Sequence, residues 1–370
     1  MAEVVLASAS ERAVWSTKYL AEYIRESGFM PYMGRAQTSI FRILSGAETG
    51  GASIVNIPLL RRLKGRGVVD SEVLEGNEED LENFNDQVRT RWIRNGVVVP
   101  KSTSYRTELD LLGAARPMLK DWAAENIRDS IIAELNSIVL PGAADANGLA
   151  GTDSTIAYSA SNATQRNAYL VANTDRILAG ASKSNSSSGV WATTLGNLDT
   201  TNDKMSTSII SLAKRMARAA DPHIRPYRLE DGREYFILFV NSLVFRDLQA
   251  DSAMQQANRD ARARGLDNPI FQDGDLIWNG VIIREIPELN SAIIPGAGAS
   301  GADVARSFLT GQSAIAIAWE QQPTPRSDPD RDYGFRPGVA TEELRGMKKV
   351  SWGGVNYGVF EILTTSAADA

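Results

Sequence analysis

The stretch RPMLKDWAAENIRDSIIAELN, residues 116–136, carries the strongest helix signal in the sequence. Within it and just before it, apolar side chains recur at steps of three and four residues. They are Leu112, Ala115, Leu119, Ala123, Ile127, Ile131 and Leu135. The spacing predicts an amphipathic helix over residues 107–137, with Pro117 marking either its start near Arg116 or a kink. From residue 116 to residue 136 the helix is a rod of about 30 Å, long enough to span a domain.

Downstream of this helix, the pattern indicates helices and strands in mixed order. A second amphipathic helix is expected over residues 203–219, with Asp203 as a candidate N-cap and Asp221-Pro222 as its stop. A strand over residues 234–240, a helix over 242–264 and a strand over 280–286 follow. Further strands are expected at 314–319, 338–344, 348–352 and 355–363. The fold class predicted is α+β, and residues 139–202, which are polar and small, read as loops and short elements.

Upstream of the long helix, residues 52–105 differ from the rest of the chain. Short β-like runs enclose a polar segment in which the charge is divided. Its first part is basic, with Arg61, Arg62, Lys64 and Arg66. The second is acidic and contains Glu78, Glu79, Asp80 and Glu82, with no basic residue from position 70 to 86. A long connection of this kind is usually functional or disordered. The charge division suits head-to-tail docking on an identical copy, and a solvated surface loop is the alternative.

The first 51 residues resemble an arm. Aromatic residues are crowded within them, including Trp15, Tyr19, Tyr23, Phe29 and Tyr32. Such density indicates burial, either under an adjacent subunit or against the chain's own core. We treat Trp15, Tyr19 and Tyr23 as candidate subunit contacts.

Composition excludes several classes of chemistry. The 370 residues contain no cysteine and one histidine, His223, so disulfides, thiolate metal sites and paired imidazoles are ruled out. His223 lies between two prolines and reads as a turn residue. The formal net charge of −6 argues against tight phosphate-driven binding of nucleic acid. No apolar run approaches a membrane span, and the N-terminus does not read as a signal peptide.

Two motifs suggest ligands but fit poorly. Residues 296–301 have the spaced glycines of a dinucleotide fingerprint, yet Pro295 precedes them and no alternating strand–helix pattern surrounds them. Residues 328–332 resemble the start of a calcium loop, but the glycine is displaced to Gly334 and Val339 stands in place of the closing glutamate. We therefore expect no catalytic residues, no bound cofactor and no metal site.

Residues 239–249, FVNSLVFRDLQ, are followed by NPIFQ at 268–272 and GVIIRE at 280–285. This order resembles the N-four-type family of phage major capsid proteins. The ending is similar to theirs as well, with GQSAIAIAW at 311–319, DYG at 332–334, GMKK at 346–349 and GVFE at 358–361. The similarity is strongest over residues 235–363 and looser over most of the remaining chain.

The resemblance implies an HK97-like capsid fold with five parts. These are an N-terminal arm (1–51), an extended β-hairpin loop (52–105), a peripheral domain (106–219) with a spine helix at about 107–137 and a polar insertion, an axial domain (220–310), and C-terminal strands returning to the peripheral domain (311–370). The polar residues 139–202 are an insertion relative to the smallest form of that fold.

The function implied is a non-enzymatic major capsid protein that assembles with itself, as hexamers and pentamers, into the icosahedral head around double-stranded DNA. Its expected partners are the portal protein and, in some capsids, scaffolding and decoration proteins; contact with packaged DNA would be non-specific. The expected location is the virion, after assembly in the bacterial cytoplasm, with no membrane contact. Alternatives are an encapsulin-type compartment shell, another virion or surface-layer protein, and a nucleotide-binding enzyme using Gly296–Gly301.

Overall fold

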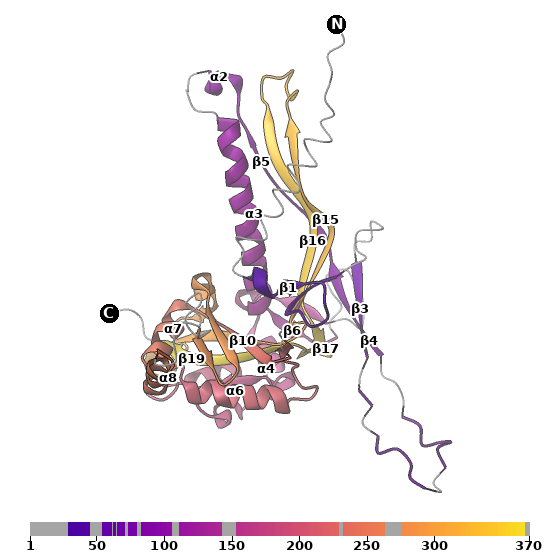
Figure 1. The fold of residues 1–370 in the computed structure, drawn as a ribbon, viewed down its shortest axis with the longest axis vertical. Coiled ribbons are helices and arrows are strands. Elements are labelled where there is room, and N and C mark those ends of the chain that lie inside the picture. The colour runs from indigo at the N-terminus through magenta and orange to yellow at the C-terminus, as the bar shows by residue number, and fades with distance from the viewer. Residues whose placement is uncertain are drawn as a thin grey trace.

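The computed structural model describes residues 29–44, 54–60, 62–63, 65–70, 73–79, 83–105, 111–142, 153–228, 232–262 and 276–366. Its long axis follows the helix α3 (Leu111–Asn136) and the strand pair β15 (Ile315–Asp328) and β16 (Gly338–Lys349), which rise together from a broader body (Figure 1). A thin loop projects from the base of this rod and points away from the rod and from the body.

A five-stranded sheet packs beside α3. Its order is β1-β2-β15-β16-β5, in which β15 and β16 form a long antiparallel hairpin and β2 pairs parallel to β15. The remaining strands are β1 (Met33–Gly34), β2 (Phe41–Leu44) and β5 (Arg91–Val98). The helix contacts β16 and β5 directly, and the short helix α2 (Lys101–Ser104) lies near the tip of the hairpin.

The body is built on an eight-stranded mixed sheet with the central order β11-β12-β10-β14-β19-β8. Two short strands, β13 and β9, extend it by pairing with β14 and β10. The strands are β8 (Ile177–Ala179), β9 (Tyr227–Arg228), β10 (Glu234–Val240), β11 (Leu276–Trp278), β12 (Val281–Glu285), β13 (Ile293–Ile294), β14 (Asp303–Thr310) and β19 (Val359–Ser366).

Helices cover this sheet, and short elements connect it to the rod. The helices are α4 (Ala163–Ala172), α5 (Trp191–Gly196), α6 (Thr207–Ala219), α7 (Ser242–Gln249) and α8 (Ser252–Arg262). The 3₁₀ turns are η1 (Met30–Tyr32), η3 (Tyr158–Ala160), η4 (Lys183–Ser186), η6 (Pro287–Ala292) and η7 (Ala299–Gly301). Two-stranded pairs are β3 (Ile54–Leu60) with β4 (Asn83–Arg89), β6 (Ile138–Leu140) with β7 (Ser154–Ile156), and β17 (Ser351–Trp352) with β18 (Val355–Asn356).

One hydrophobic cluster joins the rod to the body. The buried face of α3, with Ile127, Ile131 and Leu135, packs against residues of β10 and β14 such as Phe239 and Phe308. A second cluster fills the opposite side of the sheet beneath α6 and α7. Because one face of α3 is shared between rod and body, the two parts form one continuous core.

The helix predictions are largely confirmed, with shifted ends. The long helix begins at Leu111 and continues through Pro117. The second helix begins at Thr207, where Ser206 is the N-cap; the prediction of Asp203 was wrong because its carboxylate accepts hydrogen bonds from the amides of Ala181 and Asp199. The helix expected over residues 242–264 is divided into α7 and α8.

The C-terminal strands are longer than predicted. The strand expected over residues 314–319 runs to Asp328. Pro323 lies within a register shift that interrupts the pairing, and Pro325 is paired with Thr341. The strand expected to end at residue 344 continues to Lys349. The segment 348–352, expected as a strand of its own, is therefore the end of β16 followed by β17.

The polar segment 139–202 contributes more core than its composition suggests. Tyr169, Leu170 and Trp191 are buried, and β8 adds a parallel strand to the edge of β19. The capping box between Asn162 and Gln165 starts α4. The described part of the segment, residues 153–202, is therefore a packed layer of the body.

Of the predicted arm, residues 29–44 are described. Phe29 and Tyr32 pack edge-on against Phe239, so for these two aromatics burial is against the chain's own core. Trp15, Tyr19 and Tyr23 lie outside the described residues. In the described part of the chain, no helix is long and apolar enough to cross a membrane.

The shared core predicts a large cost for truncating the buried face of α3. Replacing Ile131, which is fully buried, with alanine is expected to lower the free energy of unfolding by about 2–5 kcal/mol through lost burial and a residual cavity. The measurement is urea denaturation of the unassembled subunit. Asp121→Ala, on the exposed face of the same helix, is the control and should change stability by less than about 0.5 kcal/mol. Equal effects from the two variants would contradict the shared core.

Candidate subunit interface

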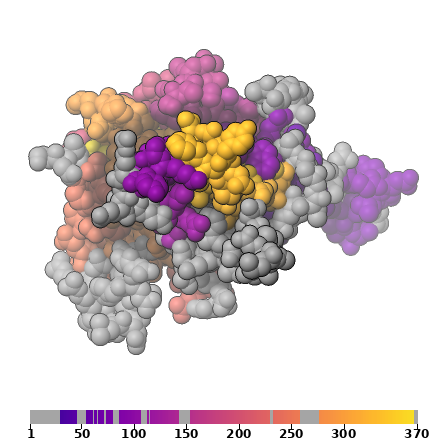
Figure 2. Space-filling model, turned by 90° about the horizontal axis from the view of Figure 1, so that it is seen from above, coloured from indigo at the N-terminus to yellow at the C-terminus, as the bar shows by residue number. Residues whose placement is uncertain are grey.

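The extended loop, residues 54–89, is the most prominent projection of the molecule. The antiparallel strands β3 and β4 form its base, pairing from Ile54 with Arg89 to Leu60 with Asn83. Beyond Leu60 the described segments of the loop leave the body, and from above they form a separate purple lobe at the edge of the molecule (Figure 2).

Apolar side chains on the loop are open to solvent. Five of them are each more than half exposed: Leu60, Leu63, Val69, Val73 and Leu74. Grouped exposed apolar side chains on a protrusion mark an interaction surface more often than scattered ones do. This surface lacks a cover within the described part of the chain.

Four of the predicted charged contacts are described, and all four lie on this loop. They are Arg62, Arg66, Glu78 and Glu79. Glu79 accepts a hydrogen bond from the amide of Gly65, which joins the two arms of the loop, and Glu78 accepts one from the amide of Gly76 at 2.6 Å. The other predicted charges, Arg61, Lys64, Asp80 and Glu82, lie outside the described residues. The proposed role of this set in docking stays a prediction.

A buried ion pair anchors the base of the loop. Lys348 on β16 contacts the carboxylate of Asp86 on β4 and donates to the carbonyl of Asp153 at 2.6 Å. The amide of Ser351 donates to the second carboxylate oxygen of Asp86 at 3.3 Å. Burial raises the pKa of Asp86, while the ammonium group of Lys348 opposes that shift. Because both side chains are almost fully buried, the pair ties the loop to the rod.

A glycine permits this close approach. A β-carbon at Gly346 would collide with the carbonyl of Arg89, where β4 crosses β16. Beside the crossing, Ile57 and Val88 of the loop pack against Ala316 and Ala318 of β15. The strands at the base are therefore held by packing as well as by charge.

A second buried polar cluster closes the C-terminal end of α3. Arg306 on β14 forms an ion pair with Glu361 on β19 and donates to the carbonyl of Asn136 at 2.9 Å. On the other side of Glu361, the hydroxyl of Tyr169 donates to its Oε2 at 3.1 Å. The last carbonyls of a helix have no partner within the helix, so these contacts satisfy groups that water cannot reach.

Lys349 completes the cluster. Its Nζ donates to the carbonyls of Leu135 and Ser137, both at 2.7 Å. Burial lowers the pKa of Lys349 to about 7, although the carboxylates of Glu361 and Glu134 oppose the shift and Arg306 adds to it. A neutral amine still has two N–H groups, which match the two carbonyls.

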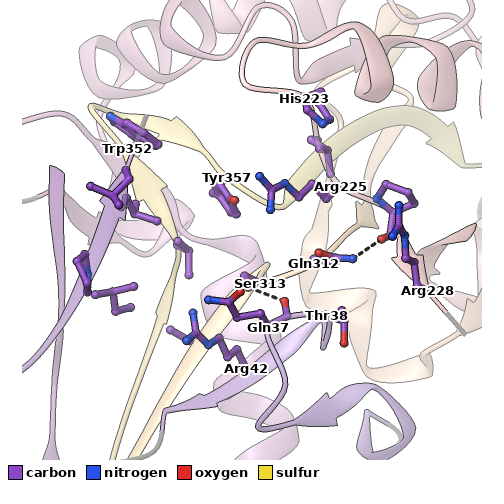
Figure 3. A pocket seen from close by; sticks show the side chains of 18 of the residues that line it. Gln37, Thr38, Arg42, His223, Arg225, Arg228, Gln312, Ser313, Trp352 and Tyr357 are labelled. Atoms are coloured by element: carbon purple, nitrogen blue, oxygen red, sulfur yellow. Dashed lines mark hydrogen bonds between the residues drawn. The ribbon is translucent and has the colours of Figure 1, made fainter. Parts of the chain in front are cut away.

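A groove opens between the base of the extended loop and the body. One of its two cavities, of about 820 Å³, is drawn in Figure 3, where Arg225 and Tyr357 face one another across it and Arg42 and Gln37 lie on the opposite side from His223. Four arginines line it: Arg42, Arg218, Arg225 and Arg228. An adjoining cavity of about 1010 Å³ shares Arg218, His223 and Arg225 and reaches Arg62 and Leu63 of the loop. His223 lies in the connection before β9, as the turn prediction required.

The two ligand-like motifs are structural turns. Residues 296–301 contain η7, and a strand follows where a phosphate-binding loop needs a helix. Residues 328–334 form the turn at the tip of the β15–β16 hairpin, in which Gly334 donates to the carbonyl of Asp330 at 3.1 Å. Within the described ranges, no three acidic, histidine or cysteine side chains are grouped as a metal site requires.

Sequence reasoning did not identify the two buried charge clusters or the groove. Asp86 was read as part of the acidic run that ends at residue 86, and Lys348 and Lys349 as the start of a strand over residues 348–352. Buried and exposed charges look alike in a sequence, and the groove unites residues from position 37 to 357.

Comparison with known proteins identifies relatives over the whole chain. A profile of the family described as "Phage capsid protein" matches residues 3–367. The major capsid protein of Pseudomonas phage KPP25 is 24% identical over 357 residues, covering 92% of this chain and 89% of that protein. The capsid of cyanophage Pam1 is 36% identical with a TM-score of 0.83 and full coverage of both chains. The capsid of Ralstonia phage GP4, at 22% identity and a TM-score of 0.70, covers 93% and 92% and supports the fold alone.

The ion pair of Asp86 and Lys348 predicts that removing one partner lowers stability more than removing both. Lys348→Met leaves Asp86 buried without its cation and is expected to lower the free energy of unfolding by about 3–5 kcal/mol. The double variant Asp86→Leu/Lys348→Met should recover most of that loss, because no buried charge remains. Urea denaturation of the wild type, the single variant and the double variant measures the loss of stability and its recovery. A double variant less stable than Lys348→Met would contradict the account.

Lys349 predicts a pH-dependent stability. Its folded pKa of about 7 lies below the ordinary unfolded value of about 10.4, so between these values the unfolded chain binds more protons. Stability from this group therefore rises with pH over that window, by up to about 1.4 kcal/mol per pH unit.

The measurement is the unfolding free energy of the wild type minus that of Lys349→Met at intervals from pH 7 to 9.5. That difference should grow with pH. A flat difference for Lys349 would show that the amine is not held neutral.

Proposed function

The chain belongs to the phage capsid protein family, and we propose that it builds the icosahedral head by docking its extended loop on the next copy. The α+β fold is that of HK97-like major capsid proteins, as the sequence resemblance implied. Its location is accordingly the virion.

One observation carries the docking proposal: the extended loop is anchored firmly at its base and uncovered beyond it. The ion pair of Asp86 and Lys348 holds the base, while Leu63, Val73 and Leu74 are exposed farther out. Burying one such side chain contributes about 1.5–3 kcal/mol, so a neighbouring copy is the natural cover.

A loop that reaches a different surface on an identical neighbour makes a heterologous contact. Such contacts close into rings when the rotation between copies divides a full turn, which suits pentamers and hexamers. The basic cluster of Arg61, Arg62, Lys64 and Arg66 would face carboxylates of the neighbour. The aromatics Trp15, Tyr19 and Tyr23 would pack beneath an adjacent subunit. Each contact can be modest, since closure of the shell multiplies it.

The finer partners follow from the same function. The shell would meet a portal protein at one vertex and, where used, scaffolding and decoration proteins. Packaged double-stranded DNA would contact it weakly, as the net negative charge suggests. Assembly would take place in the bacterial host cytoplasm, and the chain would have no catalytic activity. An encapsulin-type shell would enclose protein in place of DNA, and the match to phage capsids favours the first reading.

Charge reversal on the loop tests this proposal. The purified wild type is expected to form closed icosahedral particles, seen by electron microscopy and sedimentation. Arg61→Glu/Arg62→Glu/Lys64→Glu should lower the yield of closed shells at least tenfold, because it removes the charge complement of the next copy.

The matched control reverses three charges elsewhere, Lys183→Glu/Lys204→Glu/Arg215→Glu, and should assemble normally. Persistent wild-type monomers under assembly conditions would reject the shell function. Normal shells from the loop variant would reject the role of its basic cluster.

A further inference from the structure

The groove beside the extended loop has an excess of positive charge. The cavity of about 820 Å³ is lined by four arginines and a single carboxylate, Glu234. Arg228 and Arg218 share that carboxylate, with N–O distances of 2.9 and 3.7 Å. Arg42 and Arg225 form no ion pair with any described residue. We call this surface, defined by Arg42, Arg218, Arg225 and Arg228, the arginine groove.

The groove is also partly apolar. Ile57 of β3 and the aromatic side chains Trp352 and Tyr357 line it beside the arginines. Figure 3 shows Arg225 pointing into the space between Tyr357 and Gln312, while Gln312 itself donates to the carbonyl of Pro226 at 2.8 Å. A segment that combines acidic and apolar side chains fits such a lining better than a bare anion does.

This chain contains such a segment on the far arm of its own extended loop. In residues 73–79, Val73 and Leu74 are more than half exposed, and the exposed Glu75 and Glu78 follow directly. No basic residue occurs from position 70 to 86. We call residues 73–79 the acidic arm.

The reach of the loop suits an intermolecular contact. Residues 61–72 connect the end of β3 to the acidic arm, and 12 extended residues span at most roughly 40–43 Å. That length is comparable with the width of a domain, so an arm anchored on one copy reaches the body of the next. The groove and the arm occupy different places on every copy, as a head-to-tail ring requires.

We propose that the arginine groove of each copy receives the acidic arm of the next copy in the ring. The carboxylates of Glu75 and Glu78 pair with Arg42 and Arg225, and Val73 and Leu74 lie against Tyr357 and Trp352. This assignment rests on the loop docking proposed above and names the surface that receives it. Nucleic acid phosphate is the competing occupant of a basic groove, and the experiment separates the two.

Cysteine trapping tests the contact directly, because the natural chain has no cysteine. In assembled shells of Thr38→Cys/Leu74→Cys, mild oxidation should link an exposed groove residue of one copy to the acidic arm of the next. Denaturing gels should then show a ladder of covalent multimers ending at five and six subunits. The matched pair Lys183→Cys/Leu74→Cys should give no ladder beyond dimers. The same absence from the Thr38 pair in intact shells would overturn the proposal.

Charge exchange provides the second test. Arg42→Glu/Arg225→Glu removes no ion pair among the described residues and should lower shell yield at least tenfold. Glu75→Arg/Glu78→Arg should do the same, and combining all four changes should restore at least half of the wild-type yield. A combined variant as defective as the separate ones would contradict direct pairing.

The outcomes also separate this inference from the shell function. If the wild type forms shells and both charge variants do so equally well, the groove assignment fails while the shell function stands. If the arginine variant forms normal shells but loses encapsidated DNA, the groove binds phosphate and the proposal is overturned. If the wild type forms no shells, the proposed function itself fails.

Discussion

The buried C-terminal end of α3 is the constraint on which the rest of the structure depends. A helix end exposes carbonyls that must find donors, and here β14 and β19 of the body and β16 of the rod pack over it and exclude water. Arg306 and Lys349 supply the donors, to Asn136 in one case and to Leu135 and Ser137 in the other. Because Arg306 is itself held by Glu361, the rod cannot turn relative to the eight-stranded sheet without leaving buried polar groups unpaired.

Because that junction is rigid, the extended loop keeps a fixed direction relative to the body. A loop on a loosely attached rod would lose its direction, whereas Lys348, adjacent to Lys349 on β16, fixes the loop through Asp86. Lys349 thus joins the helix end to β16, and the adjacent Lys348 joins the loop base to the same strand. The subunit is a firm frame with an extended loop that exposes apolar side chains, and this division lets many copies make the same modest contact and still close a shell.

Local elements of this fold were predictable from the sequence, and their assembly was only partly so. The apolar steps from Leu119 to Leu135 and the β-rich run 234–240 reflect burial on one face or in a central strand, which leaves a period in the sequence. The strand β15 was cut short in prediction because proline usually ends a strand, whereas here Pro323 lies in a register shift and Pro325 is paired with Thr341. The packed layer at 154–199 was missed because its few core residues are separated by serine, threonine and asparagine. At the candidate site, the loop and its divided charge were evident, but the pairing of Asp86 with Lys348 spans 262 positions and leaves no local pattern.

Electron cryo-microscopy of the assembled shell at side-chain resolution tests the central claim most directly. The account predicts that the rod and body of each subunit superpose on the free structure, with Arg306 and Lys349 still closing the end of α3. It further predicts that the extended loop crosses to the next copy and that its acidic arm lies in the arginine groove. A loop folded back on its own body, or a helix end opened and repacked in the shell, would contradict it.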